Sequence, residues 1–463
     1  MISSPKHPQS GPVPACRRAR LACTVALSLT LLLGGCASWF EYEETPDPNT
    51  NQALNHAIWW NDFHDPLLAD LIDRAMRANP TIISAQAALQ QARALRDVSL
   101  AANRPNLTVS GSVQRNTSEG GPSSVNFRGR LDASWELDVF GANRSAVANS
   151  EAEMQAAIAN LRDVQLSMTA EVALAYIQLC SLQAQLDIAQ DNLSSQQETL
   201  QITRWRAQAG LVTSLEVAQA ETAEAQAAAQ IPTLQSNLNQ TRHSLAVLTG
   251  QTPNELETVL HAVGPIPQID AQVANVIPAD SLRQRADVRA AEARITASIA
   301  SVDEARKSRL PRFRLGGLLG LTALTLTGFS NGSALATQIL GSAAMPILDG
   351  GASKARVRVQ QAALEQTRAA YQKTLLNALK EVEDALIALH YDRERLGHLQ
   401  QAASSADNAA LLAQNRYHSG LTDYQTVLHT QRTLLGTQVS VANLQADLSS
   451  GHVRLIKAMG GGW

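Results

Sequence analysis

Few side chains in this sequence are placed to do catalytic chemistry. Four cysteines and ten histidines are spread over 463 residues, and they form no Cys/His cluster with metal-ligand spacing. The sequence has no HExxH motif, no glycine-rich phosphate loop before a predicted helix and no convincing catalytic triad. His56 and His64 flank aromatic residues, but no third ligand lies nearby, so packing or surface roles are expected. We therefore expect a protein that is not an enzyme and that needs no cofactor or metal ion.

Cys36 is the side chain whose surroundings predict a specific reaction. A positively charged segment precedes an apolar run at 21–33, which is the pattern of a secretory signal peptide. This run is too short to span a membrane stably. The small residues of Gly34-Gly35-Cys36 resemble the lipobox of bacterial lipoproteins, in which the cysteine becomes the N-terminus and carries acyl chains. A signal peptide with a chance cysteine is the alternative.

The mature chain is therefore expected to begin at Cys36. Residues 1–35 are predicted to be a signal peptide, and residues 36–65 a lipid-anchored tether. Residue 37 is Ala rather than Asp, which by the lipobox resemblance favours sorting to the outer membrane. Cys180 is then the other remaining cysteine, so no internal disulfide is expected, and Cys180 is predicted to pack as a small apolar side chain.

The sequence contains an internal duplication. When the chain is slid along itself so that Gly141 meets Gly351, Gly210 also meets Gly420, with no gap between. Matches at glycines and helix ends in constant register are uncommon by chance. Further aligned pairs are Arg206 with Arg416 and Gly250 with Gly460. We infer a first repeat at 66–250 and a second at 281–460, joined by an irregular linker at 251–280.

The first repeat contains a strand pair at 105–139. Residues 125–139 alternate strictly between apolar and polar side chains, which is the period of a strand. A transmembrane strand needs about 9–11 residues, apolar toward lipid and polar toward water. The edge hairpin of a soluble sheet is the alternative, but such a hairpin seldom carries charges of both signs in strict alternation.

The second repeat has a less regular counterpart at 312–348. From Leu315 to Leu348 there is no charged residue, so a transmembrane helix is one interpretation. Six glycines and frequent threonines interrupt the segment, and they favour two strands at about 312–326 and 334–348.

Each strand pair is followed by a very long predicted helix, at 142–209 and at 352–419. Neither segment contains a proline, and each would be roughly 100 Å long at about 1.5 Å per residue. Helices of this length must pack laterally, in a coiled coil or a helical barrel. Gly210 and Gly420 then turn the chain back into shorter helices.

Four strands cannot close a barrel, and open edges are not tolerated in lipid. A dimer would give about eight strands, whose interior side chains fill, whereas a trimer would give about twelve. We therefore predict a mainly α protein with membrane β structure. It has a twofold internal repeat, four barrel strands in each of three or more subunits, and a long periplasmic α-helical barrel continuous with the β-barrel. The net charge of −3 does not indicate nucleic-acid binding.

Several segments together resemble the TolC/OprM outer-membrane efflux family, in its lipoprotein or NodT-type branch. These segments are Trp59-Trp60 to Leu68, Trp135 to Gly141, Arg285 to Glu292, and Arg416 to Gly420. The resemblance covers essentially all of the mature chain. It implies a homotrimeric exit duct with an equatorial belt, to which the 251–280 linker is assigned. It also implies two partners, a periplasmic adaptor and an inner-membrane transporter, commonly of the RND class.

The resemblance also assigns a gate to the helix tips, at 204–217 and 414–430. It implies that Tyr417 bonds Glu216 and stabilises the closed state, by about 1.5–3 kcal/mol for a phenol–carboxylate bond. Ordinary solvated positions for both residues are the alternative.

The aperture departs from the family pattern of carboxylates around the narrowest ring. Thr426 and His429 stand at the corresponding positions, and Asp423 is the nearest carboxylate. An imidazole that gains charge in mild acid would make the aperture pH-sensitive, whereas a surface histidine would not. Arg206, Arg416 and the small residues Gly210 and Gly420 are candidates for adaptor docking, with helix capping as the alternative for the glycines.

Two other functions fit parts of the sequence. The same duct would also serve a type I protein-secretion machine, although the lipobox and the Trp59-Trp60 segment favour drug or metal efflux. A lipid-anchored periplasmic coiled coil that forms no channel is the second, and the charged alternation at 125–139 argues against it.

Overall fold

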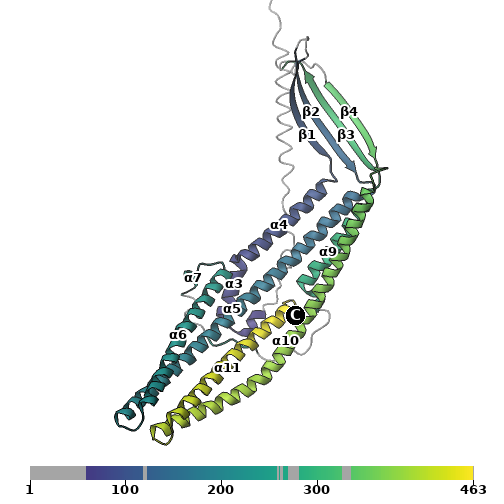
Figure 1. Ribbon diagram of the computed structural model, residues 1–463. Coiled ribbons are helices and arrows are strands. Elements are labelled where there is room, and N and C mark those ends of the chain that lie inside the picture. The colour runs from purple at the N-terminus through teal and green to yellow at the C-terminus, as the bar shows by residue number, and fades with distance from the viewer. Residues whose placement is uncertain are drawn as a thin grey trace, which may run out of the picture. The chain divides into compact units, whose positions relative to one another are not determined.

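The computed structural model describes two compact units, which we call the sheet unit and the helical unit (Figure 1). The described residues are 59–117, 123–257, 260, 264–269, 281–325 and 335–461. The predicted signal peptide at 1–35, Cys36, most of the tether and most of the 251–280 linker lie outside them. Each repeat gives its strand pair to the sheet unit and its helices to the helical unit, so the compact units cut across the duplication.

The sheet unit is one four-stranded sheet in the order β1-β2-β3-β4. Strand β2 pairs antiparallel with β1 on one side and with β3 on the other. The uncharged segment of the second repeat therefore forms strands, and its interpretation as a transmembrane helix is wrong. The strands are β1 (Asn106–Asn116), β2 (Ser124–Leu137), β3 (Arg312–Ala323) and β4 (Leu335–Ala344).

The register carries the alternation of the sequence across the sheet. Val109 lies opposite Leu131, which lies opposite Leu319 on the next strand. One residue further along β1, Ser110 lies opposite Arg130. Because successive side chains point to opposite faces, β1 and β2 are mainly apolar on one face and polar on the other, although Leu318 of β3 lies opposite Asp132 on the polar face.

The helical unit is built on two very long helices of 67 residues, α5 and α10. Each ends one residue before its predicted end. Figure 1 shows α6 returning beside α5 and α11 returning beside α10, in agreement with their packing contacts. The elements are η1 (Trp59–Phe63), α3 (Pro66–Ala78), α4 (Pro80–Ala101), α5 (Ala142–Gln208), α6 (Ser214–Leu248), α7 (Pro253–Glu257), α8 (Ser281–Gln284), α9 (Ala286–Lys307), α10 (Ala352–His418) and α11 (Tyr424–Ala458).

The main core surrounds the middle of α5. This helix is long and apolar enough to cross a membrane, yet 56% of its most apolar window is buried against other parts of the chain. Tyr176 and Cys180 lie in this core with the Trp59-Trp60 pair. The Tyr176 hydroxyl donates to Asp65, at 2.7 Å, and Asp65 also caps the start of α3. Burial raises the pKa of Cys180 to about 12, which fits the predicted packing role for this thiol.

Both long helices begin in the same way. Strand β2 stops at Leu137, two residues before the predicted end, because the Asp138 carboxylate turns to accept the amides of Asn143 and Arg144. Burial opposes ionisation, but these hydrogen bonds hold the pKa of Asp138 below its ordinary value. Asp349 accepts the amides of Gly351 and Ser353 in the second repeat.

Arg285 ties three helices together at the middle of the helical unit. Its guanidinium donates to Asp287 and to Glu381 on α10, both at 2.8 Å, and to the carbonyl of Ala458 on α11, at 2.6 Å. Burial opposes the charge, but the two carboxylates raise the pKa of Arg285. The Arg285–Glu292 segment that carries the family resemblance is therefore a structural junction.

Gly250 ends the first repeat at a close backbone contact. Its φ is +70°, and an added Cβ would lie 2.2 Å from the carbonyl oxygen of Ala78. We predict that Gly250→Ala destabilises the helical unit by at least about 2 kcal/mol, because left-handed strain adds to a clash with backbone that cannot move aside.

The measurement is the temperature at which the helical circular dichroism is lost. Gly397→Ala is the matched control, because Gly397 lies inside α10 with open space around it. It should leave that temperature unchanged or raise it, since alanine favours helix over glycine. Equal midpoints for the two variants would contradict the close backbone contact assigned to Gly250.

Candidate functional site

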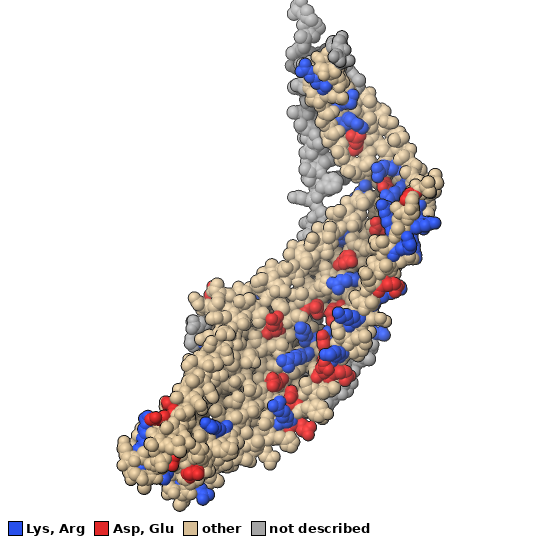
Figure 2. All heavy atoms as spheres, viewed as in Figure 1, with Lys and Arg blue, Asp and Glu red and all other residues tan. Residues whose placement is uncertain are grey.

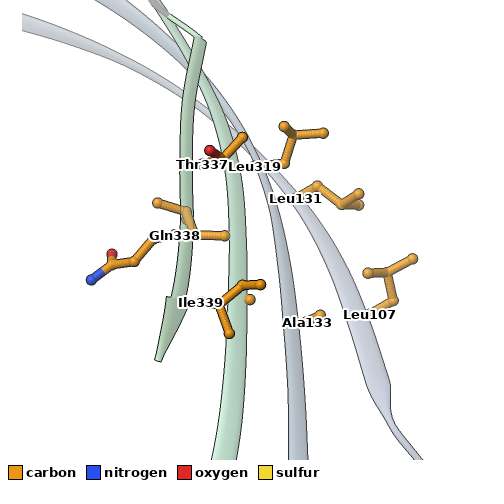
Figure 3. A pocket seen from close by; sticks show the side chains of 9 residues that line it. Leu107, Leu131, Ala133, Leu319, Thr337, Gln338 and Ile339 are labelled. Carbon is orange, nitrogen blue, oxygen red and sulfur yellow. The ribbon is translucent and has the colours of Figure 1, made fainter. Parts of the chain in front are cut away.

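The apolar face of the sheet is exposed. Val109 is 77% exposed and Ile339 is 84% exposed. Figure 3 shows Leu107, Leu131 and Leu319 along this face, with the Gln338 amide directed away from them. These leucines line a shallow cavity of about 500 Å³, because Ala133 of β2 and Gly317 of β3 are too small to fill the space between them. Exposed apolar side chains covering a continuous sheet face fit contact with lipid.

The opposite face carries charges of both signs. Arg130 pairs with Asp132 at 2.9 Å along β2, and Arg314 of β3 pairs with Glu136 at 3.4 Å. Arg130, Asp132 and Arg314 remain exposed, whereas Glu136 is half-buried. A sheet that is apolar on one side and charged on the other fits the wall of a water-filled pore.

The two outer strands leave the sheet open. Strands β1 and β4 stand at opposite ends of the strand order, so each has one edge without a partner strand in the described part of the chain. All described side chains of β1 and β4 are exposed. Such edges are templates for further strand pairing.

The helix tips end in two equivalent turns. At the first tip, the amide of Leu211 bonds the carbonyl of Arg206, at 2.9 Å, around Gly210. The second tip repeats this contact around Gly420, whose φ is +77° against +72° for Gly210. Both are helix C-terminal turns that require a left-handed residue. Capping accounts for both glycines, and their predicted role in docking stays a prediction.

Tyr417 has a different partner from the predicted one. Its side chain is 1% exposed, and its hydroxyl lies 2.9 Å from the Thr203 hydroxyl of α5. Since Thr203 donates to the carbonyl of Thr199, its oxygen accepts from Tyr417. Glu216 lies in the first turn of α6 and takes no part in this contact. Within this chain the structure does not bring Tyr417 and Glu216 together, because the ring of Tyr417 turns inward, toward α5.

Arg206 joins the two tips. Its guanidinium donates to the carbonyl of Tyr417, at 2.7 Å, and stacks over the ring of the same residue, 4.6 Å from its centroid. It thereby adds a second hydrogen bond to a carbonyl that already accepts the Gly420 amide, at 3.0 Å, at the C-terminal end of α10, where a positive charge is favoured. Its repeat equivalent Arg416 is exposed. The two arginines, predicted together as docking residues, thus differ in environment.

The predicted aperture residues lie at the start of α11. The Asp423 carboxylate accepts the amide and hydroxyl of Thr426, at 2.9 and 2.6 Å. These hydrogen bonds hold the pKa of Asp423 below its ordinary value. Asp423 is therefore a helix cap. Thr426 and His429 are exposed and lie one turn apart on the same face of α11.

A buried polar contact between α5 and α11 was missed from the sequence. Gln431 donates to Ser195, at 3.0 Å, and to Thr199, at 3.3 Å. The oxygens of Gln196, Gln431 and Tyr424 are buried without a hydrogen-bond partner among the described residues. A spacing of four residues from Ser195 to Thr199 to Thr203 marks one helix face and was the available signal. We call Ser195, Thr199, Thr203, Tyr417, Tyr424 and Gln431 the tip seam.

Comparison with known proteins agrees with this geometry. The family model described as outer membrane efflux protein matches residues 71–251 and 277–461. A pyoverdine export outer membrane protein of Pseudomonas putida, OpmQ, is 32% identical, covering 96% of this chain and 95% of its own. Nodulation protein T of Rhizobium leguminosarum bv. trifolii is 27% identical over 94% of this chain and 96% of its own.

Solved structures resemble the chain as well. The outer-membrane channel OprN is 34% identical, with a TM-score of 0.81 over 88% of this chain and 92% of its own. The outer membrane protein VceC of Vibrio cholerae is 27% identical, with a TM-score of 0.79 over 88% of this chain and 99% of its own.

The two faces of β1 give a direct test of the sheet assignment. We predict that Val109→Arg prevents assembly in the membrane, because a basic side chain toward lipid costs about 2–4 kcal/mol near the bilayer midplane. Ser110→Arg, one residue away on the polar face, should assemble normally. The measurement is the amount of heat-modifiable oligomer in outer-membrane fractions. Equal yields from both variants would show that the faces are assigned wrongly.

Proposed function

Because this chain belongs to the outer membrane efflux protein family, we propose that it forms the passive exit channel of a tripartite efflux pump. The observation that supports this function best is the sheet, with one exposed apolar face, one charged face and two open edges. Helices of 67 residues follow both strand pairs directly and would extend the wall of the duct. The charged side chains of the sheet fit a water-filled pore better than a catalytic centre.

A homotrimer would pair the open edges of the sheet. Strand β1 of one subunit would pair with β4 of the next, so three sheets would close into a barrel of about twelve strands. No backbone donor or acceptor would then face lipid unpaired. Acylation of Cys36 would anchor each subunit to the outer membrane as well.

The duct needs two partners to move its cargo. A periplasmic adaptor would contact the helix tips, where Arg416 is exposed, and an inner-membrane RND-type transporter would supply energy and substrate. Relatives are named for the export of pyoverdine and the efflux of toluene, which are chemically unlike. Such variety fits a conduit for small molecules whose selection is made by the pump.

The tip seam is the proposed gate. In the closed state, Thr203 and Arg206 on α5 hold Tyr417, and with it the α10–α11 hairpin, against α5. A neutral hydrogen bond contributes about 0.5–1.5 kcal/mol, and one with a charged donor about 1.5–3 kcal/mol. Since about 1.4 kcal/mol changes an equilibrium tenfold, these two contacts are enough to bias a two-state tip. Thr426 and His429 would face the aperture.

We predict that Arg206→Gln and Tyr417→Phe each increase the fraction of open channels. The first removes the charged bond to the α10 carbonyl, and the second removes the donor to Thr203. The increase should be roughly tenfold for Arg206→Gln and about fivefold for Tyr417→Phe. Tyr391→Phe is the control, because Tyr391 is an exposed tyrosine on the same helix. The measurement is single-channel conductance in planar bilayers, and equal open fractions in all three variants would contradict the gate.

The channel function itself is tested with the full-length protein. We expect heat-modifiable trimers in outer-membrane fractions and stepwise conductance after reconstitution into vesicles. Deletion of the gene should raise sensitivity to compounds that the pump exports, and the wild-type chain should restore resistance. A lipid-anchored scaffold would give neither trimers nor conductance, and that result would overturn the proposal.

A further inference from the structure

An open cavity of about 750 Å³ lies in the helical unit, between the end of α9 and the start of α10. Three arginines line it: Arg309, Arg312 and Arg356. Figure 2 shows basic side chains gathered over the start of α10. The remaining polar lining includes Ser301, Ser308, Ser353 and Gln360.

The three arginines are not neutralised by the chain. All are exposed, and none forms an ion pair with a carboxylate within the described residues. By contrast, Arg306 and Arg368, which line a separate groove between α9 and α10, pair with Asp303 and Glu365, at 3.7 and 2.7 Å. The cavity therefore keeps unpaired positive charge that the neighbouring groove lacks.

Two carboxylates also line the cavity, but they do not cancel its charge. Asp349 is engaged as the cap of α10, where it accepts two amides and the Ser353 hydroxyl. Glu304 is half-buried on α9. The N-terminal end of α10, which carries the positive end of a long helix dipole, adds to the basic side. The net environment favours an anion.

The lining of this cavity is next in sequence to the ends of β3 and β4, the strands proposed to cross the membrane. Arg312 is the first residue of β3, and Pro346 and Asp349 follow the end of β4. Between them lie Ile347 and Leu348, which are 91% and 94% exposed. Unpaired arginines beside fully exposed aliphatic side chains form the pattern of a protein surface that contacts both the headgroups and the acyl chains of lipid.

We propose that this cavity binds the phosphate headgroup of an anionic phospholipid in the periplasmic leaflet of the outer membrane. The guanidinium groups of Arg309, Arg312 and Arg356 bind the phosphate oxygens, because the planar fork matches phosphate geometry. Hydroxyl and amide groups of Ser308 and Gln360 face the rest of the headgroup. Ile347 and Leu348 contact the acyl chains. The proposal rests on the proposed function only in requiring that β3 and β4 cross the membrane.

The test uses the full-length protein, purified in detergent and titrated with phosphatidylglycerol. Wild-type protein should retain phosphatidylglycerol in native mass spectrometry. The triple variant Arg309→Gln/Arg312→Gln/Arg356→Gln should bind it about a hundredfold more weakly, because the loss of each arginine should weaken lipid binding roughly fivefold. The control is Arg77→Gln/Arg289→Gln/Arg395→Gln, which removes three exposed arginines elsewhere in the helical unit and should bind like wild type.

Four results would overturn the proposal. Phosphatidylcholine should bind weakly, so equal binding of both lipids would exclude a site for an anionic headgroup. Binding of inorganic phosphate in place of the lipid would indicate a site for free phosphate. If the triple variant binds lipid like wild type but has altered ion selectivity, the arginines line the duct. If it binds lipid like wild type and shows no other change, the arginines do not bind a lipid headgroup.

A folding defect is separated from a binding defect by a second variant. Arg309→Lys/Arg312→Lys/Arg356→Lys keeps the charge, so it should form trimers and bind phosphatidylglycerol at an intermediate affinity. Conductance of both triple variants in bilayers reports on the channel separately. Normal conductance with lost lipid binding supports the site, whereas lost conductance in the wild-type chain would refute the channel and not the site.

Discussion

Backbone hydrogen bonding in lipid is the constraint on which this architecture depends. A single chain supplies one four-stranded sheet whose outer strands, β1 and β4, each have an open edge. In water such edges are tolerable, but in hydrocarbon each unpaired donor or acceptor costs several kcal/mol. The sheet also exposes an apolar face that only lipid can cover without penalty. Edge and face together support the proposal that further copies of the chain close the sheet into a barrel.

The helical unit combines two kinds of packing. Its middle is an apolar core around Tyr176, reinforced by the buried guanidinium of Arg285. Its tips combine a smaller apolar cluster, which includes Leu200 and Val427, with the tip seam, whose polar side chains are incompletely hydrogen-bonded. Hydrogen bonds contribute little net stability because water can replace them, whereas apolar burial has no such substitute. A large apolar core in the middle and a smaller one at the tips fit the gate proposed above.

The duplication explains the architecture but not the gate. The two repeats share their strand pairs, their aspartate-capped helix starts and their glycine turns. At the tips they diverge, since Arg206 reaches the backbone of the other repeat while Arg416 faces solvent. The strand-to-helix junctions diverge too, because Arg144 pairs with Asp138 in the first repeat, whereas its equivalent in the second repeat, Lys354, is exposed and forms no ion pair within the described residues. Equivalent backbone positions in the two repeats therefore carry side chains with different contacts.

The sequence by itself determined the helices and the strands, and it predicted the duplication and the need for an oligomer. Alternation at 125–139, prolines and glycines at element ends, and proline-free helices are local signals, and local signals set the backbone. The sequence did not determine the partner of Tyr417. That choice depends on the rotation of α10 about its axis and its distance from α5, which long-range packing decides. Thr203 and Tyr417 are far apart in sequence, so only the tertiary structure brought them together and left Glu216 outside the contact.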